Sequence, residues 1–317
     1  MKRIGIIGAG AVTAATVASL IAPTGLDPEI ILVNRTHAKA VGLAEDFTYA
    51  AAATSRARVR AGGYADLKGA DLVIITAGVN EKDGGATDRS DDAGRRVLIP
   101  ANARAYADMI GQLREVDPTA TVLVVTDPPD PLAALARRLA PEMTVLSSGT
   151  TIDTIRFRYR VGQELGVPAS EVDAVVLGEH GTSAVYAWST ARVGGRRVLD
   201  LIGESGQDIA AVQDRVREAV KYSNISIIEG IGASQHGIGA IVAQIAEAIV
   251  DDSRAIMAVA SYREDYDTFM GLPTVLGREG AVRILEPELT DEERSLLDES
   301  ARILREADQI AFDAAGV

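Results

Sequence analysis

Residues 3–13 read RIGIIGAGAVT and contain the signals that decide the fold. The apolar, β-branched run 3–7 is typical of a buried strand, and Gly8-Ala9-Gly10 separates it from a helix-like stretch at 11–21. Glycines at such a turn let backbone amides and the helix N-terminus approach a pyrophosphate. A tight turn without a ligand is the alternative. Thr13 replaces the third glycine of this pattern, and we expect it to loosen the helix packing or shift the phosphate slightly without abolishing the site.

The first half continues this alternation of strand and helix. Further strands are expected at 30–33, 71–76, 121–126 and 143–147, and further helices at 37–52, 101–116 and 132–139. The pattern predicts an α/β, Rossmann-type parallel sheet covered by helices, which we assign to a dinucleotide-binding domain at 1–147. The polar stretch 78–94 is too long for a simple connection, and such loops are usually lids or disorder.

In the second half, the expected strands and helices no longer alternate regularly. From this order we predict an α+β substrate domain at 148–317 with antiparallel strands. Gly194-Gly195 suggests a hairpin turn. The expected helices are 152–165, 208–229, 239–251 and 291–310, and the expected strands are 172–177, 184–193, 255–261, 273–276 and 281–284.

Composition narrows the class of function. The 317 residues include 45 acidic and 32 basic side chains, for a net charge of −13, and no cysteine. This charge disfavours nucleic acid and anionic lipid as partners. The missing cysteines exclude disulfides, thiolate metal sites and a cysteine nucleophile, and no metal site is expected. Neither a signal peptide nor a run of about 18 apolar residues is present, so we expect a cytoplasmic protein without a membrane span.

The end of the second predicted strand bears on the choice of dinucleotide. Asn34, Arg35 and Thr36 stand where an acidic residue would take the ribose hydroxyls of NAD. Asn34 lacks the charge that would repel a 2′-phosphate, and Arg35 offers a planar fork for that phosphate or for the adenine face. We therefore predict NADP (NADPH) as the cofactor, with NAD the weaker alternative. A solvated surface arginine is the alternative without a ligand.

A histidine, an aspartate and an arginine form the candidate catalytic group. His180 lies in the sequence LGEHG between two predicted strands, whereas Asp153 and Arg156 are three residues apart on one face of a predicted helix. A carboxylate favours the charged imidazole, which can then protonate a carbonyl oxygen near neutral pH. An arginine can bind a substrate carboxylate in a bidentate manner. A structural histidine is the alternative for His180 considered alone.

At this point the chain resembles the L-lactate and malate dehydrogenases over nearly its whole length, and is most similar to the L-2-hydroxyisocaproate dehydrogenase branch. The motifs that carry the resemblance are GIIGAGAV at 5–12, TAG at 76–78, SSGTTIDTIR at 147–156, GEHGTSAVYAWSTARV at 178–193 and GIGASQHGIG at 230–239. The resemblance implies hydride transfer between the nicotinamide C4 and C2 of a 2-oxo or 2-hydroxy acid. His180 would be the proton donor and acceptor, Asp153 would orient it, and Arg156 would bind the carboxylate. The expected cofactor-binding residues are Gly8, Gly10, Ala11, Val12, Asn34, Arg35, Thr36, Thr76, Ala77 and Gly78.

The family also has a mobile loop whose arginine closes over the substrate. The loop is longer here than is usual in the family, so two arginines are candidates. Counting back from Asn102 in the next helix selects Arg95, whereas reading forward through 80–84 selects Arg89. We prefer Arg95, because insertions shift the forward count and a helix keeps its register.

Three departures from the family pattern bear on the substrate. Glu81 stands where lactate enzymes have glutamine and malate enzymes arginine, so it would oppose a dicarboxylate and could pair with a cation; a loop residue facing water is the alternative. Asp127, in DPPD rather than NPVD, would crowd a developing alkoxide but stabilise a protonated imine. Ser234 replaces a substrate-contacting threonine beside small residues, which suggests a roomier pocket.

Three hypotheses follow. The first is an NADP-dependent oxidoreductase of a 2-oxo or 2-hydroxy acid that is neither lactate nor malate but a larger acid, with a positive charge on the substrate as one option. The second is an NADPH-dependent reductase of a cyclic imine or iminium acid, for which Asp127 is the discriminating residue. The third is a non-catalytic NADP-binding sensor, against which the intact group of Asp153, Arg156 and His180 argues. The resemblance further implies a homo-dimer or homo-tetramer.

Overall fold

The computed structural model describes residues 2–23, 25–89 and 93–317, and its centre is one eight-stranded sheet. The expectation for residues 90–92 within the long loop therefore lies outside the described residues. Six strands pair in parallel: β1 (Arg3–Ile7), β2 (Glu29–Val33), β3 (Arg58–Ala61), β4 (Leu72–Ile75), β5 (Thr121–Val124) and β6 (Thr144–Ser147). Their order is β3-β2-β1-β4-β5-β6. The direction of winding reverses between β1 and β4, where such sheets bind ligands at the carboxyl ends of their strands.

Two strands from the second half extend this sheet. β13 (Ala260–Arg263) pairs antiparallel with β6 at Ala260 and Ser147, and β14 (Thr268–Gly271) pairs antiparallel with β13. The fold class predicted from the sequence is confirmed. The short strands β3 and β14 were not predicted. In β3, two arginines interrupt the apolar pattern of an edge strand, and in β14 the first residue, Thr268, is polar but buried.

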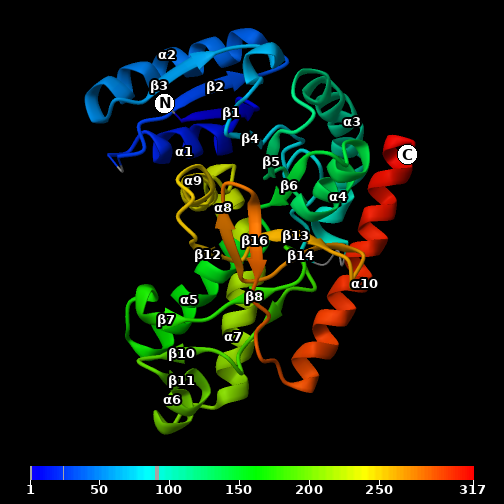
Figure 1. Ribbon diagram of the computed structural model, residues 1–317. Helices are drawn as coiled ribbons and strands as arrows, with labels where there is room; N and C mark the ends of the chain where they lie inside the picture. The colour runs from blue at the N-terminus through cyan, green and yellow to red at the C-terminus, as the bar shows by residue number, and fades with distance from the viewer. Residues whose placement is uncertain (1, 24, 90–92) are drawn as a thin grey trace.

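Helices cover both faces of the sheet (Figure 1). In β1 the side chains of Ile4 and Ile6 point to one apolar cluster, whereas Ile7 points to the other. This separation follows from the alternation of side chains along a strand. The first cluster includes residues of α1 (Ala11–Leu20), α2 (His37–Thr54) and α9 (His236–Val250), and the second includes residues of α3 (Ile99–Val116), α4 (Pro129–Leu139) and α10 (Asp291–Ala315).

Helices α1 and α9 come from different halves of the chain and cross closely. A Cβ at Gly239 would lie 2.5 Å from the carbonyl carbon and the Cβ of Ala15. The absence of a side chain at Gly239 is therefore a condition of this approach. α1 is the helix whose N-terminus follows the glycine turn, so its position depends on a helix of the second half.

The remaining elements lie in the middle and lower parts of Figure 1. The helices among them are α5 (Thr151–Leu165), α6 (Val198–Glu204), α7 (Ile209–Lys221) and α8 (Ser223–Ile231). The strands are β7 (Val172–Asp173), β8 (Val176–Leu177), β9 (Val185–Tyr186), β10 (Arg192–Val193), β11 (Arg196–Arg197), β12 (Ile256–Met257), β15 (Thr274–Gly277) and β16 (Gly280–Ile284). They pair antiparallel, and Gly194 and Gly195, at φ 56° and 79°, form the hairpin turn between β10 and β11.

The prediction of one continuous helix at 208–229 is wrong. The structure has two helices there, because α7 ends at Lys221 and α8 begins at Ser223 after a change of direction at Tyr222. The apolar sequence continues across this point, so the pattern alone contained no signal for the break. The short helix α6 was also not predicted.

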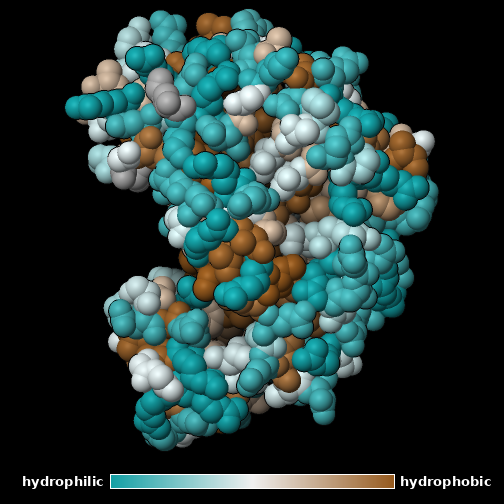
Figure 2. Space-filling model, in the orientation of Figure 1, coloured by the Kyte–Doolittle hydropathy of each residue, from teal (hydrophilic) through white to brown (hydrophobic). Residues whose placement is uncertain are grey.

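Figure 2 shows polar side chains over most of one face and an apolar area in its middle. Exposed apolar side chains of α5, β12 and β16 include Ile155, Ile256 and Val282. Within the described ranges of the chain, no helix is both long and apolar enough to cross a membrane.

Candidate active site

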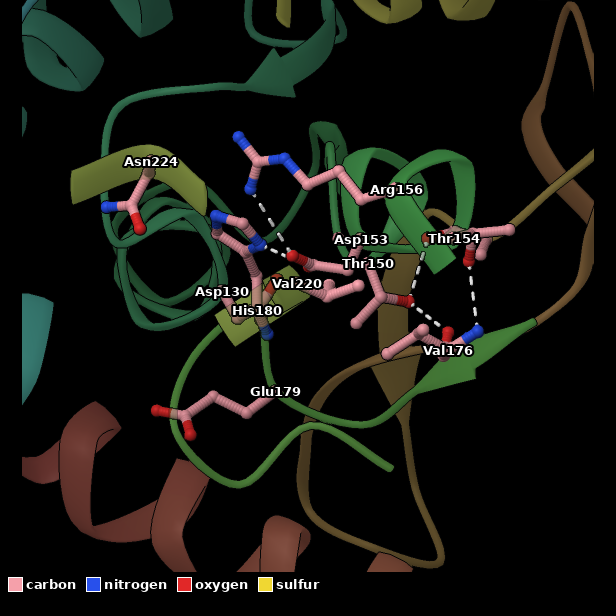
Figure 3. A network of polar contacts seen from close by, with 12 residues as sticks. Asp130, Thr150, Asp153, Thr154, Arg156, Val176, Glu179, His180, Val220 and Asn224 are labelled. Atoms are coloured by element: carbon pink, nitrogen blue, oxygen red, sulfur yellow. Dashed lines mark hydrogen bonds and ion pairs between the residues drawn. The ribbon is translucent and has the colours of Figure 1, made fainter. Parts of the chain in front are cut away.

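His180 and Asp153 form the centre of the candidate site (Figure 3). Nδ1 of His180 lies 2.5 Å from Oδ2 of Asp153. Asp153 is in the first turn of α5, and His180 follows β8 at Gly178 and Glu179. Both side chains are at least nine-tenths buried. The two residues predicted from separate motifs are thus brought into direct contact.

Several hydrogen bonds fix the segments that carry this pair. The backbone N–H of His180 donates to Oδ2 of Asp130, 3.0 Å away, and the hydroxyl of Ser147 donates to the other oxygen of Asp130. The backbone N–H of Val176, in β8, donates to the hydroxyl of Thr154, on α5, at 3.0 Å. Figure 3 shows these anchors below and beside the imidazole. The ring position is therefore determined by buried polar contacts from three parts of the chain.

The charges of this pair support each other. Burial by itself would lower the pKa of His180, but the ionised Asp153 beside it raises that pKa above the usual value. Burial likewise opposes ionisation of Asp153, and the neighbouring His180 and Arg156 hold its pKa below the usual range. The site therefore favours an imidazolium next to a carboxylate, the arrangement required of a general acid near neutral pH.

Arg156 lies on the same helix and reaches across the pocket. Its Nη1 is 3.7 Å from Oδ1 of Asp153, and its Nη2 donates to the hydroxyl of Ser234 at 3.4 Å. The Arg156 side chain is 13% exposed, and Ser234 is buried. Arg156 and Ser234, predicted as the carboxylate-binding arginine and a pocket residue, are in contact.

The structure separates the two loop arginines. Nη1 of Arg95 lies 2.6 Å from Nε2 of His180, and its side chain is 13% exposed. Arg89 instead forms a bidentate salt bridge with Glu229 on α8, with 46% of its side chain exposed. Arg95 lies where the counting from the following helix places it.

Two carboxylates hold the Arg95 guanidinium. Nε of Arg95 is 3.0 Å from Oδ2 of Asp127 and 3.3 Å from Oε1 of Glu81. Burial raises the pKa of Asp127 to about 7, and the negative Glu81 adds to this effect while Arg95 opposes it. Burial alone would raise the pKa of Glu81, but Arg95 and hydrogen bonds from Asp127 and Asn224 keep it below its usual value. Of these two carboxyl groups, Asp127 therefore binds a proton more readily than Glu81.

The cavity lined by His180, Asp153, Arg95, Arg89 and Asn224 has a volume of about 60 Å³. This volume holds a few water molecules rather than an organic acid. The Arg95 side chain occupies the space next to Nε2 of His180, which an acid bound at that atom would have to share.

The glycine turn fits the pyrophosphate of a dinucleotide. Gly8 has φ 134°, and a Cβ there would lie 2.3 Å from Oγ1 of Thr76. A Cβ at Gly10 would meet nothing within 4 Å, and no side chain in the described part of the chain caps α1. The first amides of α1, at Ala11 and Val12, are therefore available to a phosphate.

Thr13 has a role that the sequence did not predict. Its hydroxyl is buried and lies 2.7 Å from that of Thr76 at the end of β4. Thr76, Ala77 and Gly78 follow β4 directly, and a Cβ at Gly78 would lie 2.2 Å from the methyl group of Thr126. The missing third glycine is thus replaced by a hydrogen bond between α1 and β4.

Asn34, Arg35 and Thr36 lie together at the carboxyl end of β2, next to the glycine turn. The N–H of Gly8 donates to the carbonyl of Val33 at 2.8 Å. Asn34 donates from Nδ2 to the carbonyl of Thr36 at 3.0 Å, and Arg35 is exposed. The position therefore presents an amide and a guanidinium where an acidic residue would take a ribose.

Sequence reasoning missed two residues of the site. Asp130 was quoted only as part of DPPD, although a carboxylate at the start of α4 near a strand end could have indicated it. Asn224 carries no motif, and only the fold brings it to Glu81. In the described part of the chain, no group of His, Asp and Glu side chains converges as metal ligands would.

The chain is similar to known proteins over almost its whole length. Residues 2–145 match the family model described as the lactate/malate dehydrogenase NAD binding domain, and residues 150–314 match the corresponding alpha/beta C-terminal domain. L-lactate dehydrogenase of Chloroherpeton thalassium is 38% identical, covering 96% of this chain and 98% of its own length. That of Deinococcus radiodurans is 37% identical, with coverage of 96% and 97%. The minor L-lactate dehydrogenase of Enterococcus mundtii has a TM-score of 0.88 at 27% identity, with coverage of 97% and 98%.

Proposed function

The chain belongs to the lactate and malate dehydrogenase family, and from this premise we propose that it is an NADP-dependent dehydrogenase. It transfers a hydride between the nicotinamide and C2 of a 2-oxo or 2-hydroxy carboxylic acid other than lactate or malate. The observation that carries the chemistry is the buried contact between His180 and Asp153, with Arg156 one helical turn away. The L-2-hydroxyisocaproate branch and the domain boundary at residue 147 stay predictions.

The chain's own residues supply the proton and the binding of the acid. When bound, NADPH supplies the hydride. Nε2 of His180 donates a proton to the oxygen on C2, and Asp153 stabilises the imidazolium before the transfer. Arg156 binds the substrate carboxylate, with Ser234 beside it. Nε2 cannot accept a hydrogen bond while it holds this proton, so Arg95 must leave Nε2 and can then polarise the C2 oxygen.

Support for NADP comes from the end of β2. Asn34 adds no negative charge there, and the exposed Arg35 is placed to pair with a 2′-phosphate. Support for a substrate other than malate comes from Glu81, because its ionised carboxylate would repel the second carboxylate of a dicarboxylic acid.

A cofactor titration and an acid panel test the proposal. We expect a higher kcat/KM with NADPH than with NADH. Equal or better turnover with NADH would contradict the proposed pairing of Arg35 with the 2′-phosphate. Across 2-oxo acids, the highest kcat/KM with pyruvate or oxaloacetate would contradict the substrate assignment. Tight NADP binding without turnover of any acid or imine would favour the non-catalytic sensor.

A second candidate function is the reduction of a cyclic imine or iminium carboxylic acid. It is favoured by Asp127, whose buried Oδ1 has no hydrogen-bond partner among the described residues and whose pKa is about 7. A carboxylate there can stabilise a protonated imine nitrogen. In this case, Asp127→Asn raises activity on 2-oxo acids and lowers it on imines; the same loss on both contradicts this candidate.

We also propose that the protein is a homo-dimer or homo-tetramer, without nucleic acid or membrane partners. The apolar area in Figure 2 supports a protein interface, because soluble monomers rarely expose large apolar patches. Light scattering of the purified protein measures the mass, and a monomer across micromolar concentrations would contradict the proposal.

A further inference from the structure

The guanidinium of Arg95 lies among three groups of the candidate site. One side of this planar group contacts Nε2 of His180 at 2.6 Å, and the other contacts Asp127 at 3.0 Å and Glu81 at 3.3 Å. The two carboxylates therefore lie one guanidinium's width from the proton donor. They are ligands of a cation in the very space where the reacting carbonyl must bind.

One of the two carboxylates has an oxygen atom that can accept a further hydrogen bond. Oδ1 of Asp127 is buried and has no hydrogen-bond partner in the part of the chain that the structure describes. A buried oxygen of this kind is costly to leave without a donor. The pocket thus contains an acceptor that Arg95 leaves unused.

A third side chain orients Glu81 from across the pocket. Nδ2 of Asn224, on α8, donates to Oε1 of Glu81 at 3.0 Å, and Asn224 is 4% exposed. Figure 3 shows Asn224 above and to the left of the imidazole of His180. Oε1 is also the oxygen nearest Arg95, so Asn224 holds that oxygen toward the cation. Asn224 is a positioning residue for Glu81.

The consequence follows from charge. In the proposed function Arg95 leaves Nε2 of His180 when the substrate binds, and its guanidinium then moves relative to Glu81 and Asp127. A substrate with a neutral side chain would leave these buried groups with less compensation, and uncompensated buried charge is expensive. A substrate with its own cationic group supplies the positive charge that Arg95 provides in the absence of substrate.

On the basis of the proposed function, we propose that Glu81, Asp127 and Asn224 form a subsite for a positive charge on the substrate, close to its reacting carbon. The substrate class is a carboxylic acid with an ammonium, guanidinium or iminium group near C2. A cation at the end of a long side chain does not fit, because one guanidinium spans the distance from His180 to both carboxylates.

A matched pair of substrates separates the effect of the substrate's charge on kcat/KM from the effect of its shape. 3-(Trimethylammonio)-2-oxopropanoate and 4,4-dimethyl-2-oxopentanoate have nearly the same shape, and only the first carries a positive charge. Neither can cyclise to an imine. Steady-state kcat/KM of each is measured with NADPH at pH 8, where Asp127 is mostly ionised, with pyruvate as a third substrate.

The wild-type protein is expected to prefer the cationic substrate over its neutral isostere and over pyruvate by at least about tenfold. Glu81→Gln and Asp127→Asn are each expected to reduce the preference for the cation, mainly through KM. Asn224→Ala is expected to reduce it partly, because Glu81 remains but is no longer held. Asp83→Asn removes an exposed charge two residues from Glu81, and this control is expected to keep the preference.

The outcomes separate the two proposals. Equal kcat/KM for the matched pair, or a preference for pyruvate over both, overturns the subsite while NADPH-dependent turnover retains the proposed function. A preference that persists in the Glu81→Gln and Asp127→Asn variants also overturns it. Turnover of no 2-oxo acid, together with equal affinities of the matched pair measured calorimetrically with bound NADPH, overturns both. Tighter calorimetric binding of the cation without turnover supports the subsite and contradicts only the proposed function.

Discussion

Nε2 of His180 faces Arg95 at 2.6 Å, and Nδ1 of the same ring faces Asp153 at 2.5 Å. A guanidinium only donates, so Nε2 accepts in this arrangement and the proton of the neutral ring is on Nδ1. While Arg95 contacts Nε2, the ring is therefore neutral there, and the imidazolium that Asp153 favours requires Arg95 to be withdrawn. The neutral form is the one that would take a proton from a hydroxy acid in the proposed function. Reduction of an oxo acid needs the protonated form, with Arg95 withdrawn.

Replacement of Asp153 tests the charge coupling. In Asp153→Asn the imidazolium loses its carboxylate, and burial then lowers the pKa of His180. Reduction needs the imidazolium, so its activity should decline at a lower pH than in the wild type. We expect kcat for reduction at pH 7 to fall by about 10²–10⁴-fold. The pH profile of kcat in both directions checks this, and an unchanged midpoint would contradict it.

The two loop arginines form a matched pair for mutagenesis. Arg95→Gln is expected to lower kcat/KM by about 10²–10³-fold, because a buried donor beside His180 is lost. Arg89→Gln removes an exposed salt bridge to Glu229, worth about 0–1 kcal/mol, so its effect should be small. A larger loss from Arg89→Gln than from Arg95→Gln would reverse the assignment.

Cofactor choice should respond to a single charge at the end of β2. Asn34→Asp places a carboxylate near the position proposed for the 2′-phosphate, which repels NADPH and favours NADH. We expect the ratio of kcat/KM for NADPH to that for NADH to fall by at least about tenfold, roughly the effect of 1.4 kcal/mol. Asn34→Ser serves as the neutral control. Equal ratios in the two variants would count against this position.

The preference for a cationic substrate should depend on pH through Asp127. Its pKa is raised to about 7, so the group is neutral below this value and negative above it. The kcat/KM ratio of the cationic substrate to its neutral isostere should therefore rise as the pH increases from 6 to 8. In Asp127→Asn the ratio should be flat over this range. A kcat/KM ratio that falls with increasing pH would contradict the predicted direction.

Stability should depend on the crossing of α1 and α9. Gly239→Ala introduces a Cβ 2.5 Å from Ala15, which forces the helices apart. We expect the free energy of unfolding to fall by about 1–3 kcal/mol, with weaker NADPH binding as α1 moves. Gly111→Ala on α3 is the control, since a Cβ there meets nothing within 4 Å. It should be neutral or stabilising by up to about 1 kcal/mol. Denaturant unfolding of both variants provides the comparison.

The parts of the protein that were predicted correctly depend on short stretches of chain. The strand and glycines at 3–13 predicted β1, its turn and α1, because backbone conformation and apolar periodicity are local properties. The family was likewise identified from motifs, and the matches to its two domains confirm it. The long α10 was predicted from its periodicity, although it extends to Ala315 rather than residue 310.

Other features could not be read from local patterns. The break at Tyr222 interrupts a continuous apolar periodicity. Val212, Val216 and Val220 of α7 belong to one apolar cluster, which includes no described residue of α8. Asn224 and Glu81 are 143 positions apart, and nothing near either residue indicates the other. The sequence left Arg89 and Arg95 as alternatives, because the length of a loop does not define where its side chains point.

The sequence by itself thus determined the glycine turn, the parallel sheet and the residue types proposed for a proton donor and a carboxylate-binding arginine. Only the tertiary structure decided that Arg95 reaches His180, that Glu81 and Asp127 meet around its guanidinium, and that Asn224 holds Glu81. The reason is physical. Local sequence controls backbone conformation and which face is buried, whereas the charge state of a buried group depends on side chains that only long-range packing brings within a few ångströms.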